Sequence, residues 1–306
     1  MMEDVIKTEN LSKYFGNVHA VESVSLKVRK SEIYGFLGLN GAGKTTTIRM
    51  LLGMIRPTAG SAFLFGEKVS ASTCSLWERV GYLVETPSSY PELTVWENLE
   101  IIHRLRRMPD KKLVEAVIDK LQLTSYRNIK AKNLSLGNAQ RLGLAKALLH
   151  HPDILILDEP ANGLDPAGIV EMRELFRDLV SNHGVTIFIS SHILGEISKF
   201  ATRIGIIHEG RLIQELNTDQ LGRLLYKKLV VNALDKEAVR LKLINDGYSV
   251  NLSKDGNLEI TDEGAINHPE KIASILVQAE LPPTLLKVKE EDLESYFLRM
   301  IGVNAK

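Results

Sequence analysis

The sequence has few of the features that disulfide-stabilised or membrane-spanning chains need. Its 306 residues include a single cysteine, Cys74, which excludes an intramolecular disulfide and fits a reducing compartment. No apolar run is nearly as long as a membrane-spanning helix, which needs about 18 residues. The N-terminal MMEDVIKTEN also lacks the charged-then-apolar order of a secretory signal. We therefore expect a cytoplasmic protein unless a partner holds it at a membrane.

The chain also lacks a net charge. Lysine and arginine total 38 residues, aspartate and glutamate also total 38, and 44% of the residues are apolar, as in ordinary soluble globular proteins. This balance gives no general attraction to nucleic acid or to anionic lipid. The length favours about two domains.

A glycine-rich stretch, GLNGAGKTT at residues 38–46, matches the phosphate-binding pattern G-x-x-x-x-G-K-[ST]. It follows a predicted buried strand (33–37) and opens a predicted helix (45–54). Backbone N–H groups and a helix N-terminus in this arrangement face phosphates; a glycine-rich turn without a ligand is the alternative. The Lys44 ammonium would contact the phosphates, and the Thr45 hydroxyl would ligate Mg²⁺. The candidate nucleotide-binding residues here are Gly38, Asn40, Gly41, Ala42, Gly43, Lys44, Thr45 and Thr46.

Two adjacent carboxylates, Asp158 and Glu159, follow the apolar run ILIL (154–157), which predicts a buried strand. Such carboxylates lie beside the ligand crevice of a parallel sheet. There Asp158 would hold Mg²⁺ through water and Glu159 would polarise the attacking water. His192 directly follows another predicted strand (185–191) and would contact the γ-phosphate. A plain turn after the strand and an incidental histidine are the alternatives.

The remaining sequence predicts an α/β fold around this site. Residues 5–28 alternate as two or three strands of an antiparallel sheet, and residues 88–150 show the apolar spacing of a helical insert. Residues 219–306 predict a small α/β domain with a hairpin turning at Asp255 and Gly256. That domain has no catalytic motif, so it serves either regulation and dimer support or packing alone.

Five motifs occur in the order GLNGAGKTT, LSLGNAQR, ILILDEP, NGLDP and SSH. Over about residues 1–215 this order resembles the ATP-binding subunit of an ABC transporter. The resemblance implies a P-loop ABC-type nucleotide-binding domain at residues 1–218, with a mixed sheet core, that hydrolyses ATP with Mg²⁺. It also implies a dimer in which LSLGN of one subunit closes over the ATP held by the other.

The resemblance assigns roles to five positions. Ser135 and Gly137 would face the partner's ATP, and both lie at the start of an apolar-periodic helix, which is an anion-binding terminus. Asp165 matches the aspartate of the dimer interface, and His192 matches the switch histidine. Phe15 matches the aromatic residue that stacks on adenine, although the pair Tyr14 and Phe15 also fits a core position.

Two segments depart from the family pattern, at three positions in all. In LSLGN, Leu136 and Asn138 replace a glycine and a glutamine, but Ser135 and Gly137 are kept, so we expect function to survive. Glu85 stands where the family usually has glutamine. Its carboxylate can offer an oxygen to Mg²⁺ and adds negative charge near the γ-phosphate, so Glu85 is both a catalytic and a metal-binding candidate.

Glu85 and the SLG signature together resemble the ATPases of bacitracin-type and lantibiotic-type resistance exporters. That branch implies a motor subunit that exports a drug or peptide antibiotic through a separate multi-span permease. The motor subunit itself would be peripheral, on the inner face of the cell membrane. Its ATP-binding partner would be a second copy or a paralogue, with no nucleic acid involved. The basic run Arg104, Arg106 and Arg107 predicts a solvated helix face, with a docking surface as the alternative.

The alternative function is a soluble ABC-type ATPase that acts on nucleic acid or the ribosome. Such chains usually have two nucleotide modules, long coiled coils or basic surfaces, and none of these is evident in the sequence. A P-loop kinase or GTPase is a third hypothesis, but it would leave the LSLGNAQR helix and His192 without roles.

Overall fold

The computed structural model describes residues 3–70, 73–85, 88–253 and 255–302. Contacts between Cα atoms divide the chain into two compact units, Met1–Asp219 and Gln220–Lys306. Each unit has an apolar core of its own. In the part of the chain that the structure describes, none of the helices combines the length and the apolarity that crossing a bilayer requires.

A six-stranded mixed sheet is the centre of the first unit, with the strand order β11-β10-β4-β9-β8-β7. All neighbouring strands pair in parallel except β10 and β11, which pair antiparallel. Every residue of β4, β8 and β9 is buried, as expected for parallel strands covered on both faces. The strands are β4 (Ile33–Leu37), β7 (Val80–Leu83), β8 (Ile154–Asp158), β9 (Thr186–Ser191), β10 (Arg203–His208) and β11 (Arg211–Asn217).

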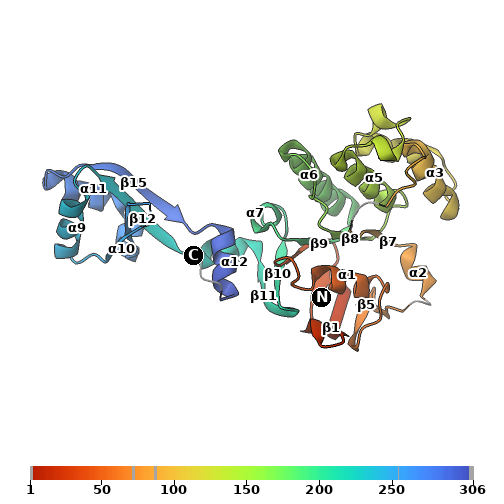
Figure 1. Cartoon of the computed structure of the whole chain (residues 1–306), viewed down its shortest axis with the longest axis horizontal. Helices are drawn as coiled ribbons and strands as arrows, with labels where there is room; N and C mark the ends of the chain where they lie inside the picture. Colours follow the sequence, from red (N-terminus) through yellow and green to blue (C-terminus); the bar gives the residue numbers. More distant parts are fainter. Residues whose placement is uncertain (1–2, 71–72, 86–87, 254, 303–306) are drawn as a thin grey trace. The chain divides into compact units, whose positions relative to one another are not determined.

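A second, antiparallel sheet contains the N-terminal strands, as predicted. Helix α1 (Lys44–Leu51) lies between the two sheets (Figure 1), and its side chains Ile48, Met50 and Leu51 share one core with both of them. The helix ends three residues before the predicted end at residue 54. The antiparallel strands are β1 (Asp4–Phe15), β2 (Val18–Val24), β3 (Lys27–Arg29), β5 (Ala59–Leu64) and β6 (Glu67–Lys68).

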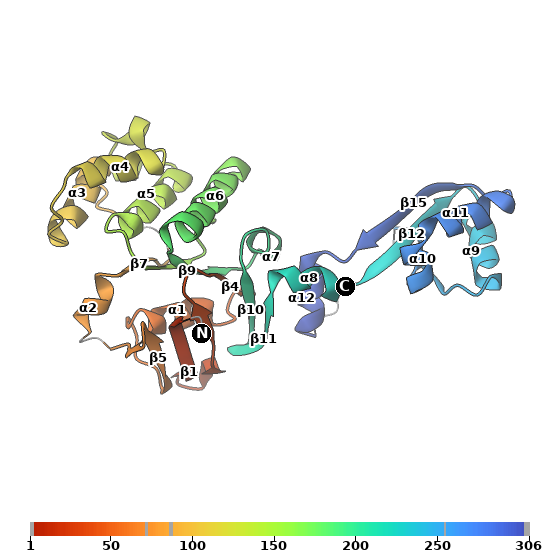
Figure 2. The ribbon, with the colours of Figure 1, turned by 180° about the vertical axis from the view of Figure 1, so that it is seen from behind.

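Helices α3 to α6 cover the face of the six-stranded sheet opposite α1 (Figures 1 and 2). Helix α3 starts with a capping box between Thr94 and Glu97, which satisfies two otherwise free backbone N–H groups. The predicted helical insert is therefore present. The helices of this unit are α2 (Cys74–Trp77), α3 (Val95–Leu105), α4 (Lys112–Lys120), α5 (Leu136–Leu148), α6 (Pro166–His183) and α7 (Leu194–Ile197), with 3₁₀ turns at Thr124–Tyr126 and Ala131–Asn133, and α8 (Thr218–Leu224) at the junction with the second unit.

The second unit is a four-stranded antiparallel sheet in the order β13-β14-β12-β15, and its core is shared with α9, α10 and α11. Its predicted α/β character is confirmed, but helix α10 was not predicted. The Ser253 N–H donates to the Asn257 carbonyl, so the hairpin connection is longer than the predicted two-residue turn. The elements are β12 (Lys227–Ala233), α9 (Lys236–Asn245), β13 (Val250–Leu252), β14 (Leu258–Ile260), α10 (Glu263–Asn267), α11 (Pro269–Gln278), β15 (Pro283–Glu290) and α12 (Leu293–Met300).

Candidate nucleotide site

Three neighbouring parallel strands in the middle of the six-stranded sheet end at the same edge. Strand β9 lies between β4 and β8, and its register aligns Ser191 with Leu37 and Ser190 with Asp158. The chain leaves these strands as the phosphate loop, as Glu159 and as His192. Since ligands of open α/β sheets bind outside the carboxyl ends of the strands, this edge is the candidate site.

The phosphate loop turns sharply before α1. Gly43, with φ +105°, precedes the helix, and a Cβ atom on it would lie 2.5 Å from the Ala20 carbonyl oxygen. Only glycine accepts both the positive φ and this close approach. At the loop tip Asn40 and Gly41 are exposed, whereas Ala42 is buried.

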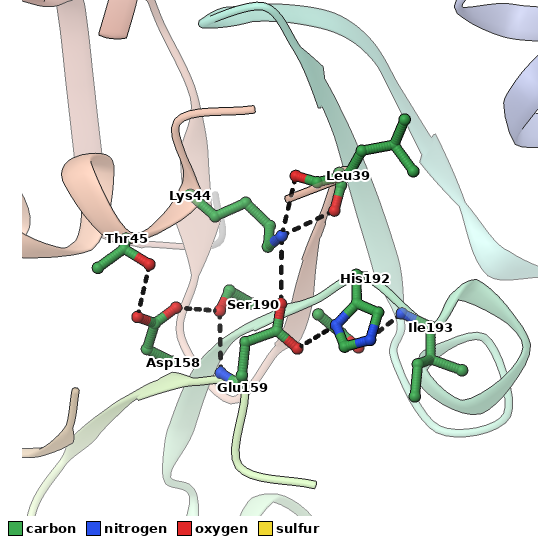
Figure 3. Close-up of polar contacts among 10 residues, drawn as sticks. Leu39, Lys44, Thr45, Asp158, Glu159, Ser190, His192 and Ile193 are labelled. Atoms are coloured by element: carbon green, nitrogen blue, oxygen red, sulfur yellow. Dashed lines mark hydrogen bonds and ion pairs between the residues drawn. The ribbon is translucent and has the colours of Figure 1, made fainter. Parts of the chain in front are cut away.

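Lys44 is buried, with 6% of its side chain exposed. Its Nζ donates to the carbonyl oxygens of Gly38 at 2.7 Å and Leu39 at 3.2 Å. The same ammonium lies 3.1 Å from Glu159 Oε1 (Figure 3). The phosphate loop and the end of β8 are therefore joined through one charged group.

Asp158 and Thr45 form the second pair of the site. The Thr45 hydroxyl donates to Asp158 Oδ2 at 2.8 Å, while the Ser190 hydroxyl donates to Oδ1 at 2.5 Å. Ser190 Oγ in turn accepts the Glu159 N–H at 3.0 Å (Figure 3). Ser190 is not among the residues predicted from the sequence. The signal for it was its position at the end of the predicted strand, two residues before His192.

The Glu159 carboxylate lies between two nitrogen groups. Its Oε2 is 2.8 Å from His192 Nδ1, and its Oε1 contacts the Lys44 ammonium (Figure 3). The backbone of Glu159 has φ +49°, in the left-handed region, a conformation that costs about 1–3 kcal/mol and is concentrated at functional sites. The fold thus aims this carboxylate at the phosphate loop.

The Thr45 and Asp158 side chains suit Mg²⁺ by their chemistry. Mg²⁺ in nucleotide sites is bound by one or two carboxylates together with phosphate oxygens and water, and a hydroxyl beside a buried carboxylate provides such a donor set. Over the ranges that the structure describes, there is no cluster of three or more His, Cys, Asp or Glu side chains able to hold a metal ion.

The predicted signature and interface residues lie at two other helix N-termini. Ser135 caps α5, where its hydroxyl accepts the Asn138 N–H at 3.3 Å. Asp165 caps α6, where its Oδ1 accepts the Gly168 N–H at 2.8 Å. Gly137 lies in the first turn of α5. The capping hydrogen bonds of Ser135 and Asp165 are thus made within their own helix ends.

Phe15 and Glu85 have no hydrogen bond or ion pair with Lys44 or Asp158 among the described residues. Phe15 ends β1 with 51% of its surface exposed, and Lys13 Nζ lies 5.1 Å from its ring centroid. Glu85 forms an ion pair with Arg49 of α1 and is not bonded to Thr45 or Asp158. An exposed aromatic ring remains suitable for stacking on a base.

Glu85 lines a cleft of about 750 Å³ together with residues of α1, β7, α3 and α5. Arg106, predicted on a solvated face, lines this cleft and donates to the Trp77 carbonyl at 2.9 Å. Arg106 is therefore half-buried and bonded to the chain, not on a fully solvated face, whereas Arg104 is 70% exposed. In the same cleft burial lowers the pKa of Lys146 to about 8.

Lys146 connects the segment after Glu85 to α5. Its Nζ donates to the Ser88 carbonyl at 2.8 Å, to Ser89 Oγ at 3.1 Å and to Asn98 Oδ1 at 3.2 Å. Lys146 is not among the residues predicted from the sequence, because its contacts are with residues about 50 or more positions away along the chain.

Comparisons with known proteins agree with this geometry. Residues 21–162 match the family model described as "ABC transporter". The chain is 40% identical to the bacitracin transport ATP-binding protein BcrA of Bacillus licheniformis over 303 residues, which cover 98% of each chain. It is 36% identical to the lantibiotic transport ATP-binding protein SrtF of Streptococcus pyogenes over 215 residues, 70% of this chain and 92% of the relative.

Solved structures give the same result for the fold. The structure of an ATP-binding subunit of an ABC transporter superposes with a TM-score of 0.66 at 26% identity, covering 72% of this chain and 92% of the other. A dimeric ATP-binding cassette bound to ADP and Pi superposes with a TM-score of 0.65 at 23% identity, covering 70% and 98%. The chain therefore belongs to the ABC transporter family as an ATP-binding subunit, a class of ATPases that drive transport.

Proposed function

We propose that two copies of this chain, or one copy and a paralogue, bind two ATP molecules with Mg²⁺ between them. Hydrolysis then drives export of a peptide antibiotic or a similar amphiphilic drug through a separate membrane permease. The names of the relatives, bacitracin transport and lantibiotic transport ATP-binding proteins, support this substrate class. In this proposal residues 1–218 form the ATP-binding domain, with a helical subdomain at 88–150, and residues 219–306 form an accessory domain.

The position of Glu159 is the observation that carries the proposed chemistry. Its carboxylate contacts Lys44 and His192 at once, beside the phosphate loop. A γ-phosphate would compete with Glu159 for the Lys44 ammonium, because both are anions that one buried cation can hold. Released from Lys44, Glu159 would accept a proton from the attacking water, while His192 would contact the γ-phosphate and report its loss.

The other site residues take supporting roles. Thr45 and Asp158 would hold Mg²⁺, which neutralises charge on the phosphates when bound. Phe15 would stack on the adenine. The N–H groups and side chains that would surround the phosphates belong to Gly38, Asn40, Gly41, Ala42, Gly43, Lys44, Thr45 and Thr46.

The dimer and the permease complete the proposed assembly. Ser135 and Gly137 would meet the nucleotide of the partner subunit, since they lie at the N-terminus of α5, which favours anions. Asp165, at the start of α6, would lie at the dimer interface. The cleft beside Glu85 would receive the permease, and this would keep the chain at the inner face of the membrane. Closure of the dimer would move the segment around Glu85, and this movement would pass to the permease through the cleft.

The test is the variant Glu159→Gln, which keeps the shape of the side chain but removes the base. We expect ATP turnover to fall by about 100-fold or more, because removing a general base typically costs 10²–10⁴-fold. Size-exclusion chromatography with light scattering should show a shift from monomer to dimer with ATP and Mg²⁺, since the closed state no longer reopens. Turnover equal to wild type would remove Glu159 from this role.

The transport part has a separate test. Cells that express the chain with its permease should tolerate more bacitracin-type or lantibiotic-type peptide than cells that express the permease with Glu159→Gln. Equal sensitivity of the two strains to every such peptide would contradict the proposed substrate class.

A further inference from the structure

Leu136, the signature residue that stands in place of glycine, packs on the NGLDP segment of its own chain. It is the first residue of α5 and 57% of its surface is exposed. A Cβ atom on Gly163 would nonetheless overlap Leu136 Cγ and Cδ2, and would lie 3.3 Å from Leu136 Cβ. Gly163 also has φ +80°, so both the packing of Leu136 and the backbone require glycine at this position.

Two further contacts join the same helix ends. A Cβ atom on Gly137 would lie 3.3 Å from the Gly163 carbonyl oxygen, so the two backbones are close. Five residues along α5 from Leu136, Arg141 forms an ion pair of 2.5 Å with Glu171 of α6. Helices α5 and α6 lie side by side in both views of the chain (Figures 1 and 2).

The contact lies between residues that the proposed dimer uses. Leu136 is flanked by Ser135 and Gly137, which would meet the partner's nucleotide, and Gly163 lies two residues before Asp165. A glycine at position 136 would have no side chain to cover Gly163. Leucine therefore provides a packing contact that the usual signature sequence lacks.

We propose that Leu136 is a positioning residue that fixes the signature turn of α5 to the NGLDP segment, so that the two move as one body when the dimer closes. This inference rests on the proposed function, since it gives both segments a place at the dimer interface. Its chemical basis is the apolar contact of Leu136 with the Gly163 backbone, and no group of the Lys44 site takes part.

ATPase measurements on the full chain test the proposal by a double-mutant cycle. Leu136→Ala removes Cγ and Cδ but keeps Cβ and the helix propensity. We expect it to lower kcat by about tenfold with the KM for ATP within about twofold of wild type, since the phosphate loop is unchanged. Gly163→Ala should lower kcat at least as much. The double variant should be no slower than Gly163→Ala, because the Leu136 Cγ and Cδ2 atoms that the new Cβ would overlap are then absent.

Two control variants separate the contact from general effects. Gly66→Ala introduces alanine at φ +78° where nothing lies within 4 Å, so it reports backbone strain without the overlap. Leu241→Ala removes a leucine of 53% exposure from α9. Both controls should keep the wild-type kcat. A double variant slowed by the product of the two single effects would overturn the proposal.

Hydrogen exchange on the nucleotide-free chain tests the contact without the dimer. Leu136→Ala should raise exchange both at residues 135–140 and at residues 161–168, where the Leu164 and Gly168 amides are hydrogen-bonded. Faster exchange confined to 135–140 would overturn the proposal, because the two segments would then not be coupled. If wild type never dimerised with ATP, the proposed function would fail, and the exchange result would still decide the role of Leu136.

Discussion

Lys44 is the residue at which the phosphate loop and the candidate base meet. Its ammonium is held by the Gly38 and Leu39 carbonyl oxygens and by the Glu159 carboxylate. A buried charge needs such partners, because its desolvation is otherwise expensive. The ion pair with Glu159 is the part that a phosphate would replace.

Lys44→Ala should weaken ATP binding by about tenfold or more, because a charge-assisted hydrogen bond contributes about 1.5–3 kcal/mol. Titration with a fluorescent ATP analogue measures the Kd. Lys13→Ala, which removes an exposed ammonium near Phe15, is the control and should have a much smaller effect. An unchanged Kd for Lys44→Ala would contradict the assignment of the loop.

His150 makes the free energy of unfolding depend on pH. Burial, together with the nearby Arg106 guanidinium, lowers the pKa of His150 from 6.5 to about 4. In the folded chain the ring is therefore neutral at pH 5–6, whereas in the unfolded chain it binds a proton. By linkage, the unfolded state binds more protons in this window, so the free energy of unfolding falls as the pH falls from about 6.5 towards 4.

The variant His150→Gln removes this titration but keeps a donor for the Val80 carbonyl, which lies 3.2 Å from His150 Nε2. Urea unfolding at pH 6.5 and pH 5 should show that wild type loses more stability over this interval than the variant. An equal loss in the two proteins would show that His150 titrates normally in the folded state.

At the scale of secondary-structure elements, the approach of α5 to β7 sets the position of the signature turn. A Cβ atom on Gly81 of β7 would overlap the Ala147 carbonyl oxygen of α5 and lie 3.0 Å from Pro152 Cγ. The strand and the helix backbone are thus in contact without a side chain between them. Any side chain at position 81 must push α5 away from the sheet.

Gly81→Ala should therefore lower the free energy of unfolding by about 1–3 kcal/mol, the usual cost of overpacking. Gly222→Ala is the matched control, because Gly222 lies in α8 with nothing within 4 Å of an added Cβ. This control should leave stability unchanged or raise it by up to about 1 kcal/mol. Guanidinium unfolding of the two variants measures the difference, and equal stabilities would contradict the packing argument.

At the scale of the whole molecule, each of the two units has an apolar core of its own, and these two cores share none of the residues that the structure describes. The core of the first unit includes both sheets and α1, and the core of the second unit includes β12, β14, α9 and α11. The candidate nucleotide site lies entirely in the first unit. Ligand binding and the stability of the second unit should therefore be separable.

Leu229→Ala tests this separation, since Leu229 is fully buried in β12. The loss of about 2–5 kcal/mol typical of such truncations should appear in the unfolding of the second unit, with the Kd for ATP unchanged. ATP at about 100 times its Kd should raise the free energy of unfolding of the first unit by about 2.7 kcal/mol. Calorimetry measures this shift. If ATP shifted the unfolding transitions of both units in Leu229→Ala, the expectation that the two units unfold independently would be wrong.

The fold class and the family were predictable from the sequence alone, and so were the parts of the candidate site that are adjacent in the chain. A strand, a glycine-rich turn and a helix are adjacent in the chain, as are the ILIL strand and its two carboxylates, so short-range patterns were sufficient to predict them. Helix α1 ends three residues before its predicted end, and helix α10 was not predicted, because helix stability also depends on packing beyond the local sequence.

Only the tertiary structure decided which of these groups touch. Thr45 and Asp158 are 113 residues apart in the chain, and Ser190 joins Asp158 across 32 residues. The tertiary structure likewise pairs Glu85 with Arg49 and places Leu136 on Gly163. Periodicity and motif spacing report only neighbours along the chain, whereas these contacts exist because parallel strands align their carboxyl ends and because α5 and α6 pack side by side.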